Sequence, residues 1–172
     1  GLGEAADALA AAGSSDLVLV LETGATLRGR VSGAAATDRN DVEVWIQRRD
    51  EAHGGTAPVR DDGSFERTDL APGLYDIVAC TRDGLAGVRA GVEVPRGAIA
   101  QSVEVRVTRG AKLTVRLGVW ANEQWARVVQ DGVTVAWARP DGRSDAVLTV
   151  PAGVTQVELH ARGARFDMAR PL

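Results

Sequence analysis

The sequence predicts an all-β protein made of two small antiparallel β-sandwiches in tandem. Three observations carry this prediction. Apolar and polar residues alternate in many short runs, 20 glycines and 6 prolines punctuate the 172-residue chain, and one pattern of turns and strands occurs twice. Short runs of period two, separated by turn residues at close intervals, are typical of sandwiches rather than of helical folds.

Residues 1–16 are interpreted as an N-terminal tether. The alanine-rich segment 4–13 contains strong helix formers and ends at a glycine, but it is short and has a weak apolar face. The next run, Leu17–Leu21, is apolar on both faces, which indicates a strand with cover on both sides. We expect it to be a strand of a preceding module, pairing either within this chain or with another molecule.

An internal repeat divides the rest of the chain. Residues 17–31 align over residues 103–117 without a gap, and the Asp-Gly turn at Asp62 recurs at Asp141. We therefore predict a first sandwich over residues 17–109 and a second over residues 110–172 that lacks its last strand. A sandwich that lacks a strand exposes an unpaired edge, so edge-strand self-association is one expectation.

The alternating runs locate the strands along the chain. Within the first unit Phe65, Tyr75, Ile77 and Ala79 share one parity and are expected to face the core together. Strands are predicted at residues 17–21, 27–31, 42–47, 64–68, 75–81, 88–94, 102–107, 113–117, 133–138, 146–150, 156–161 and 165–168.

Four motifs follow one another in the first unit: Gly29–Val31, Val42–Ile46, Asp62–Phe65 and Leu70–Tyr75. Through them residues 24–108 resemble the carboxypeptidase regulatory-like domain, a transthyretin-like, Ig-like sandwich. The Gly-x-Pro insertion usual in that family is replaced here, and the second unit keeps only the skeleton of turns. The resemblance implies an accessory module with no catalytic residues and no cofactor, so no enzymatic activity is expected.

Composition and charge exclude several functional classes. The formal net charge of −3 gives no broad positive field to hold a phosphate backbone, so no nucleic-acid partner is expected. One cysteine, Cys80, makes no intrachain disulfide, and together with His53 and His160 it is too little for a zinc site of cysteines and histidines. No apolar run has the length of a membrane helix, so direct membrane insertion is not expected.

Two further kinds of chemistry have weak support. Lys112, Glu158 and Asp167 stand in the order needed for an isopeptide bond of the kind found in the related B-type repeats of Gram-positive adhesins. Along their strands Lys112 and Glu158 alternate with residues predicted to face the core, so their own side chains are predicted to face outward. This parity argues against the bond. Acidic loops at residues 37–41 and 60–62 offer oxygen ligands for Ca²⁺, but without an EF-hand pattern, and solvated turn acids are the simpler interpretation.

The tryptophans give the better indication of binding. Trp45 and Trp120 have the parity of polar neighbours and are predicted to face outward, whereas Trp137 shares the parity of core valines. An outward tryptophan beside polar side chains stacks sugar rings or anchors an interface, and burial against a neighbouring unit or loop is the alternative. Trp45, Trp120 and Trp125 are the candidate ligand-binding residues.

These observations favour a noncatalytic structural, spacer or interaction module of a larger bacterial protein. We expect it outside the cytoplasm, either secreted, periplasmic or at the cell surface, with neighbouring domains of the same protein or another protein as its partners. The alternative is a carbohydrate-binding module that uses exposed tryptophans, with a glycan as its partner.

Overall fold

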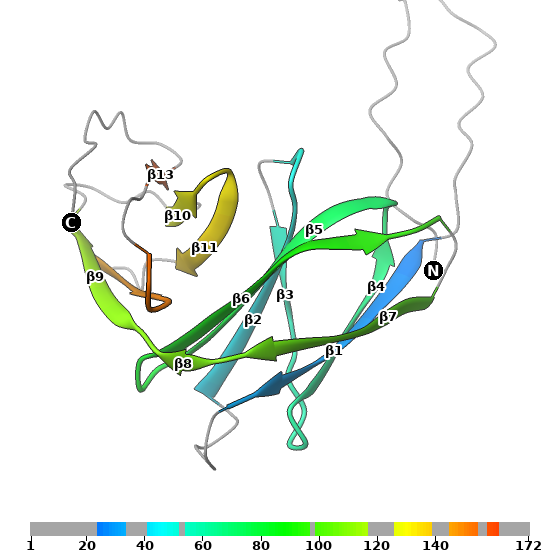
Figure 1. Cartoon of the computed structure of the whole chain (residues 1–172), viewed down its shortest axis with the longest axis horizontal. Helices are drawn as coiled ribbons and strands as arrows, with labels where there is room; N and C mark the ends of the chain where they lie inside the picture. Colours follow the sequence, from blue (N-terminus) through cyan, green and yellow to red (C-terminus); the bar gives the residue numbers. More distant parts are fainter. Residues whose placement is uncertain are drawn as a thin grey trace, which may run out of the picture.

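The computed structural model describes residues 24–33, 41–51, 54–96, 99–116, 126–138, 145–154 and 158–161. The elements in these ranges are thirteen β-strands, so the predicted all-β class is confirmed (Figure 1). No helix in the described ranges is long and apolar enough to cross a membrane. The expected tether and the predicted strands at 17–21 and 165–168 lie outside the described residues.

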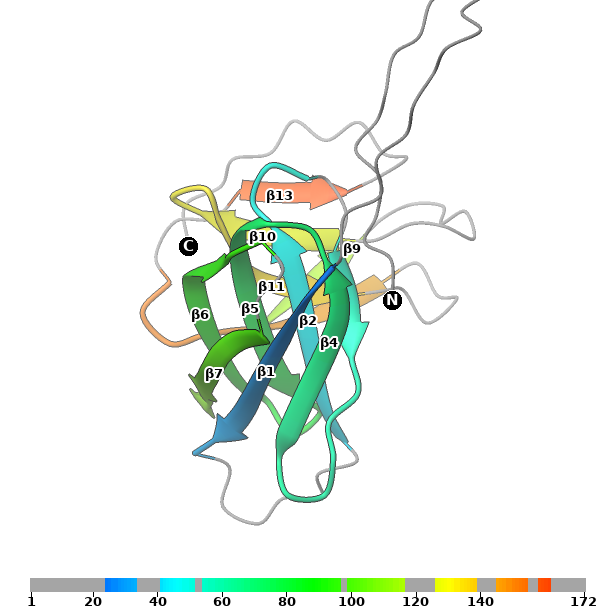
Figure 2. The same ribbon diagram turned by 90° about the vertical axis from the view of Figure 1, so that its right-hand side faces the viewer.

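The first unit is a sandwich of two sheets (Figures 1 and 2). The smaller sheet has the order β4-β1-β7 and the larger has the order β3-β2-β5-β6-β8. The bounds in the smaller sheet are Ser64–Leu70 for β4, Ala25–Ser32 for β1 and Ile99–Arg106 for β7. Those in the larger sheet are Gly54–Ala57 for β3, Val42–Arg48 for β2, Gly73–Thr81 for β5, Leu85–Val94 for β6 and Thr108–Arg109 for β8.

The core of the first unit fills the space between these two sheets. Phe65, Tyr75, Ile77 and Ala79 are all buried in it, which confirms the inward parity that the sequence predicted. The Phe65 ring lies directly over Gly29 of β1, where an added Cβ would stand 2.2 Å from the Phe65 Cζ atom. Glycine at this position therefore makes room for the ring, as close packing in a core requires.

Among the described strands the pairings are antiparallel except that of β1 with β7, which is parallel and runs from Thr26↔Ile99 to Ser32↔Arg106. The parallel pair arises because the chain crosses from β6 in the larger sheet to β7 in the smaller one. After β7 the chain returns to the larger sheet, where β8 pairs with the start of β6.

The second unit repeats the strand pairing of the first. Its two sheets are β12-β9 and β11-β10-β13, and the first unit has the corresponding orders β4-β1 and β3-β2-β5. The start of β1 pairs Ala25 with Leu70, and the start of β9 pairs Ala111 with Val150. The bounds are Ala111–Arg116 for β9, Ala126–Gln130 for β10, Val133–Ala138 for β11, Asp145–Val150 for β12 and Glu158–Ala161 for β13. The division of the chain at residue 110 stays a prediction.

A second cluster of buried residues joins the two units. It consists of Val128, Val135, Ala136, Leu148 and Val150, with Val88 of β6 packed against it. The larger sheet of the first unit is thus covered on both faces. Strand β5 shows this most clearly, because its residues 75–79 are buried without interruption and no longer alternate.

Three strands were not predicted from the sequence. Strand β3 contains two glycines, and β8 is only two residues long. Strand β10 forms a hairpin with β11 through Asp131 and Gly132, whose φ angles of 52° and 76° are the positive values that a type I′ turn requires. The Asp-Gly pair between two valine-rich runs is the signal that could have located β10.

A buried carboxylate fixes an irregularity in the larger sheet. Asp76 of β5 accepts a hydrogen bond from the Arg49 Nε atom and another from the backbone nitrogen of Gly91, both at 2.9 Å. The pairing of β5 with β6 shifts register between Tyr75 and Ile77, and Gly91 has a φ of 65°. The side chain of Asp76 thereby satisfies a backbone donor that the ladder leaves without a strand partner.

The chain's one tyrosine gives a prediction on alkaline stability. The Tyr75 hydroxyl donates to the Ala71 carbonyl at 2.8 Å, and burial raises the pKa of Tyr75 from 10.0 to about 12. Because the unfolded state loses the proton first, the contribution of Tyr75 is fully present below pH 10 and is lost as the pH rises toward 12. We expect tyrosinate absorbance of the folded protein to titrate near the upper value.

The Tyr75→Phe variant is the matched control for this titration. It should lack that part of the alkaline loss of stability and should be less stable by about 1 kcal/mol at neutral pH, since it loses one hydrogen bond. A tyrosinate midpoint in the folded protein equal to that of the unfolded chain would contradict the burial of Tyr75.

Candidate functional site

Trp45 lies on the outer face of the larger sheet, where the second unit covers it. Its indole stacks on Trp137 of β11, with ring centroids 3.8 Å apart and an angle of 14° between the planes. Trp45 is only 7% exposed, so its predicted role as an open binding platform is wrong, and the alternative of burial against a neighbouring unit is what the structure shows. Trp137, expected in the core of its own unit, packs on the first unit instead.

Buried hydrogen bonds accompany the stacked rings. The Gln47 side-chain oxygen accepts a bond of 3.1 Å from the Thr134 hydroxyl and one of 3.5 Å from the Trp45 indole nitrogen. The Gln47 amide nitrogen donates to the Glu51 carbonyl at 2.9 Å. Because buried polar groups are costly unless they are paired, these contacts favour one arrangement of the two units. We call the contacts of Trp45 and Gln47 with Trp137 and Thr134 the junction.

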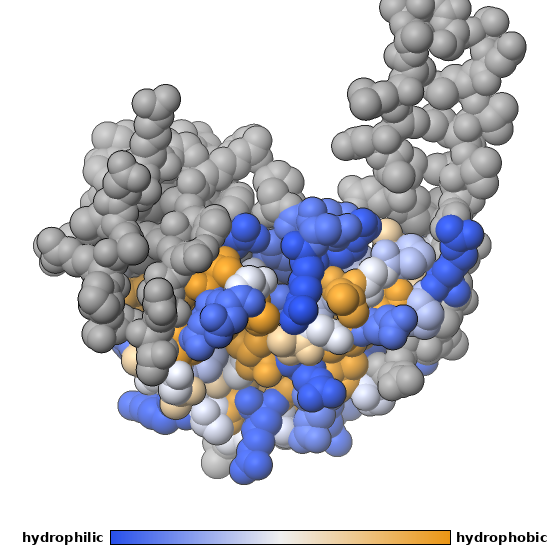
Figure 3. All heavy atoms as spheres, turned by 45° about the horizontal axis from the view of Figure 1, so that its top comes forward, coloured by the Kyte–Doolittle hydropathy of each residue, from blue (hydrophilic) through white to orange (hydrophobic). Residues whose placement is uncertain are grey.

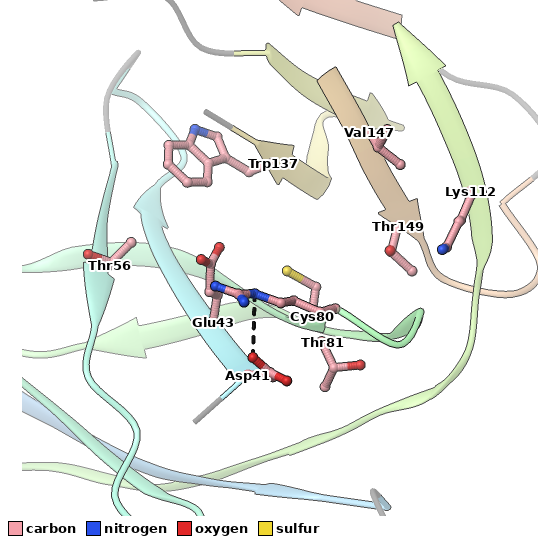
Figure 4. Close-up of a pocket in the computed structure, with 10 residues that line it drawn as sticks. Asp41, Glu43, Thr56, Cys80, Thr81, Lys112, Trp137, Val147 and Thr149 are labelled. Atoms are coloured by element: carbon pink, nitrogen blue, oxygen red, sulfur yellow. Dashed lines mark ion pairs between the residues drawn. The ribbon is translucent and has the colours of Figure 1, made fainter. Parts of the chain in front are cut away.

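A cleft with a volume of about 480 Å³ lies beside the junction (Figure 4). Its walls come from both units. Glu43 of β2 and Cys80 of β5 belong to the first unit, whereas Lys112 of β9 and Val147 of β12 belong to the second. Trp137 extends from the junction into the wall, so the stacked ring connects the two features.

The cleft contains two exposed opposite charges that have no ionic partner among the described residues. Asp41 and Arg82 pair with each other at 3.4 Å. Glu43 and Lys112 also line the cleft, and neither forms an ion pair or a side-chain hydrogen bond in the described part of the chain. Figure 4 shows the amino group of Lys112 directed into the cleft from the wall opposite Glu43.

Lys112 lies beside a tight turn at Gly84. Gly84 has a φ of 93°, and a Cβ added there would stand 3.7 Å from the Lys112 Cε atom. The Thr81 hydroxyl contacts Asp83 and accepts a hydrogen bond of 3.0 Å from the Leu85 backbone nitrogen, which holds the same turn. The Lys112 side chain is exposed beside this turn.

Cys80 is the one thiol of the chain and lines the cleft. Burial raises the pKa of the Cys80 thiol to about 11, and the negative charge of Glu43 adds to the shift. The thiol is therefore protonated at neutral pH, whereas a nucleophilic cysteine needs a lowered pKa. Cys80 serves as a small half-buried wall of the cleft.

The other predicted site residues fall into two groups. Trp120, Trp125, His53, Asp167 and the loop residues 37–40 lie outside the described residues. Lys112 and Glu158 lie on strands of different sheets, β9 and β13. Within the described ranges no group of three or more histidine, cysteine, aspartate or glutamate residues could hold a metal ion.

The large apolar residues that stay exposed in the described part are Leu74 and Val147. On the face drawn in Figure 3, hydrophilic side chains lie among the apolar ones and divide them. Val147 is 56% exposed and lines the cleft, so the cleft offers apolar surface as well as charge. Glu43 and Val147 were not predicted as site residues from the sequence, although the outward parity of Glu43 was a usable signal.

The fold and the junction define the chain as an all-β protein with sandwich-type packing. No protein-family profile and no curated protein matches it. Similar solved structures include the Bacillus anthracis TIE protein, at 16% identity and a TM-score of 0.40, covering 80% of this chain and 28% of that one. DUF3823 family proteins from Bacteroides ovatus and Parabacteroides merdae match at 17% and 16% identity, with TM-scores of 0.36 and 0.35.

These two matches cover 80% and 83% of this chain and 91% and 94% of the respective other chains. The chain spans under a third of the length of the TIE protein, of which it covers 28%. At such distances the similarities assign neither a family nor a function.

Proposed function

We propose that the chain is a noncatalytic spacer or interaction module of a larger bacterial protein that is secreted, periplasmic or displayed at the cell surface. The observation that carries the proposal is the junction, in which Trp45 stacks on Trp137 and Gln47 accepts from Thr134. A spacer must keep the distance between its neighbours, and two units joined by buried contacts keep one orientation.

The connection between the units supports the same function. Strand β8 is followed by Gly110 and then by β9, so a single residue separates the two strands. The Gly110 nitrogen donates to the Gly84 carbonyl at 2.9 Å, and a Cβ added at Gly110 would stand 2.5 Å from the Val150 carbonyl oxygen. Such a link does not act as a flexible tether, in contrast to long glycine- and serine-rich linkers.

The proposal of a noncatalytic role has support from two sides. The thiol of Cys80 is protonated at neutral pH, because burial raises its pKa to about 11. The resemblance of the first unit to carboxypeptidase regulatory-like domains favours an accessory module, whose partners are neighbouring domains of its own protein or another protein.

Joint tumbling of the two units tests the spacer function. Amide relaxation measured by NMR should give the strands β1–β7 and β9–β12 one rotational correlation time. The double substitution Trp137→Ala and Gln47→Ala should separate the two values, because it removes the stacked ring and the buried acceptor while leaving the link at Gly110 intact.

The Thr108→Ala variant is the matched control, since Thr108 is exposed on β8 close to the link and takes no part in the junction. It should leave the single correlation time unchanged. Two clearly different correlation times in the wild-type protein would refute a rigid spacer.

A carbohydrate-binding role is the second candidate. Because Trp45 is covered, sugar binding would depend on Trp120 and Trp125. It would also depend on Trp137, which lines the cleft. A sugar that stacks on an indole changes tryptophan fluorescence. Titration with a panel of polysaccharides should give saturable quenching if this role holds, and the absence of a response from every member would remove it.

A further inference from the structure

We propose that the cleft beside the junction binds a small zwitterion with an apolar body, of the kind represented by free amino acids and short peptides. This inference goes beyond the spacer function, which requires no ligand. It depends on three properties of the cleft: two opposed charges without ionic partners in the described part of the chain, an apolar wall between polar groups, and contributions from both units.

The charged side chains of the cleft favour a ligand with one positive and one negative group. Asp41 and Arg82 pair with each other at 3.4 Å, whereas Glu43 and Lys112 have no ion pair within the described residues and are exposed to a ligand. A ligand without polar groups would displace water from both groups without replacing their hydrogen bonds, which is unfavourable. A ligand with an ammonium group toward Glu43 and a carboxylate toward Lys112 would pair both charges, and such charge-assisted hydrogen bonds are among the stronger polar contacts.

The apolar wall of the cleft favours a ligand with an apolar body. Val147 is exposed in the cleft, and the indole of Trp137 lines the cleft while being held against Trp45. The side chain of an apolar amino acid would cover Val147 and remove apolar surface from water. The hydroxyl groups of Thr56 and Thr149, which also line the cleft, could pair with a peptide amide.

The size and position of the cleft fit such a ligand. A volume of about 480 Å³ lies within the range of small-molecule sites and is large enough for a short peptide. Glu43 belongs to β2 and Lys112 to β9, so the ligand would contact both units at once. Binding therefore depends on the orientation that the junction sets.

Lys112 offers a direct probe, because it is the chain's only lysine. Reductive methylation with isotope-labelled formaldehyde keeps its positive charge and gives one side-chain NMR signal, distinct from that of the N-terminal amine. We expect phenylalanine and the dipeptide alanyl-phenylalanine to move this signal saturably. The comparison of these two probes distinguishes a free amino acid from a peptide as the preferred ligand.

Analogues with one charge test the zwitterion requirement. N-acetylphenylalanine keeps the carboxylate alone, and phenylalaninamide keeps the ammonium group alone. Each should bind about tenfold more weakly than the matching zwitterion, the change expected for the loss of one charge-assisted contact. Equal binding of all three probes, or no saturable shift by either zwitterion up to its solubility limit, would overturn the proposal.

Variants assign the binding to the cleft. By calorimetry on the unmodified protein, Glu43→Gln and Lys112→Met should each weaken zwitterion binding about tenfold, and Lys112→Arg should retain most of it. Glu104→Gln changes an exposed acid on β7 and is the matched control. Unchanged affinity in both Glu43→Gln and Lys112→Met would place the binding elsewhere and refute the site, whereas the tumbling experiment tests the spacer function separately.

Discussion

Replacing Phe65 by alanine is expected to lower the free energy of unfolding by about 3 to 5 kcal/mol, the range measured for large aromatic truncations in cores. Phe65 is 1% exposed and packs between the two sheets of the first unit. Its ring also occupies the space above Gly29, so its loss leaves a cavity lined by backbone that cannot easily close. Urea denaturation followed by tryptophan fluorescence measures the change.

Gly29 provides an independent check on the packing of this ring. The Gly29→Ala variant should lose about 1 to 3 kcal/mol through overpacking. The same substitution should cost clearly less in the F65L background, because leucine has no atom at the position of the ring's far end. Additive losses in the double variant would show that Gly29 and the ring are not in contact.

Replacing Asp76 by alanine is expected to have the second large effect, a loss of about 1 to 3 kcal/mol, the cost of leaving a buried backbone donor unsatisfied. The Asp76 carboxylate is buried and accepts from both Arg49 and the Gly91 backbone nitrogen. The substitution leaves the Gly91 donor unsatisfied inside the larger sheet, and it leaves a guanidinium without its partner.

The Asp76→Asn variant separates the charge from the hydrogen bonds. Asparagine keeps an acceptor oxygen for Gly91, so it should restore a large part of the stability lost in the alanine variant. Arg49→Ala should also destabilise the fold, because it leaves the Asp76 carboxylate, which is 3% exposed, without its ionic partner. Equal stability of the Asp76→Ala variant and the wild type would mean that the carboxylate has no structural role.

Much of the first unit could be predicted from local patterns. Period-two alternation placed Phe65, Tyr75 and Ile77 on one face, and all three are in the core. Alternation could not show what covers the opposite face of the same sheet. The apolar run of residues 77–79 contained that information, because it does not alternate, and all three residues are buried in the structure, which requires cover on both faces.

The binding surface was harder to predict than the strands. Parity assigned Trp45 correctly to the outer face of β2, but its exposure depends on Trp137, which is distant in sequence and reaches it only through packing of the two units. The cleft likewise combines Glu43 and Lys112 from strands of different units. Such long-range placement leaves no periodic signal in the sequence, whereas a turn such as Asp131-Gly132 does.

The parallel pairing of β1 with β7 determines how the first unit responds to mechanical tension. The N-terminal end of β1 and the C-terminal end of β7 lie at opposite ends of the paired strands, with register from Thr26↔Ile99 to Ser32↔Arg106. A force that pulls the two ends apart would therefore shear all the hydrogen bonds between these strands together instead of opening them one at a time. Resistance of this kind suits a module that keeps other domains apart while the chain is under load.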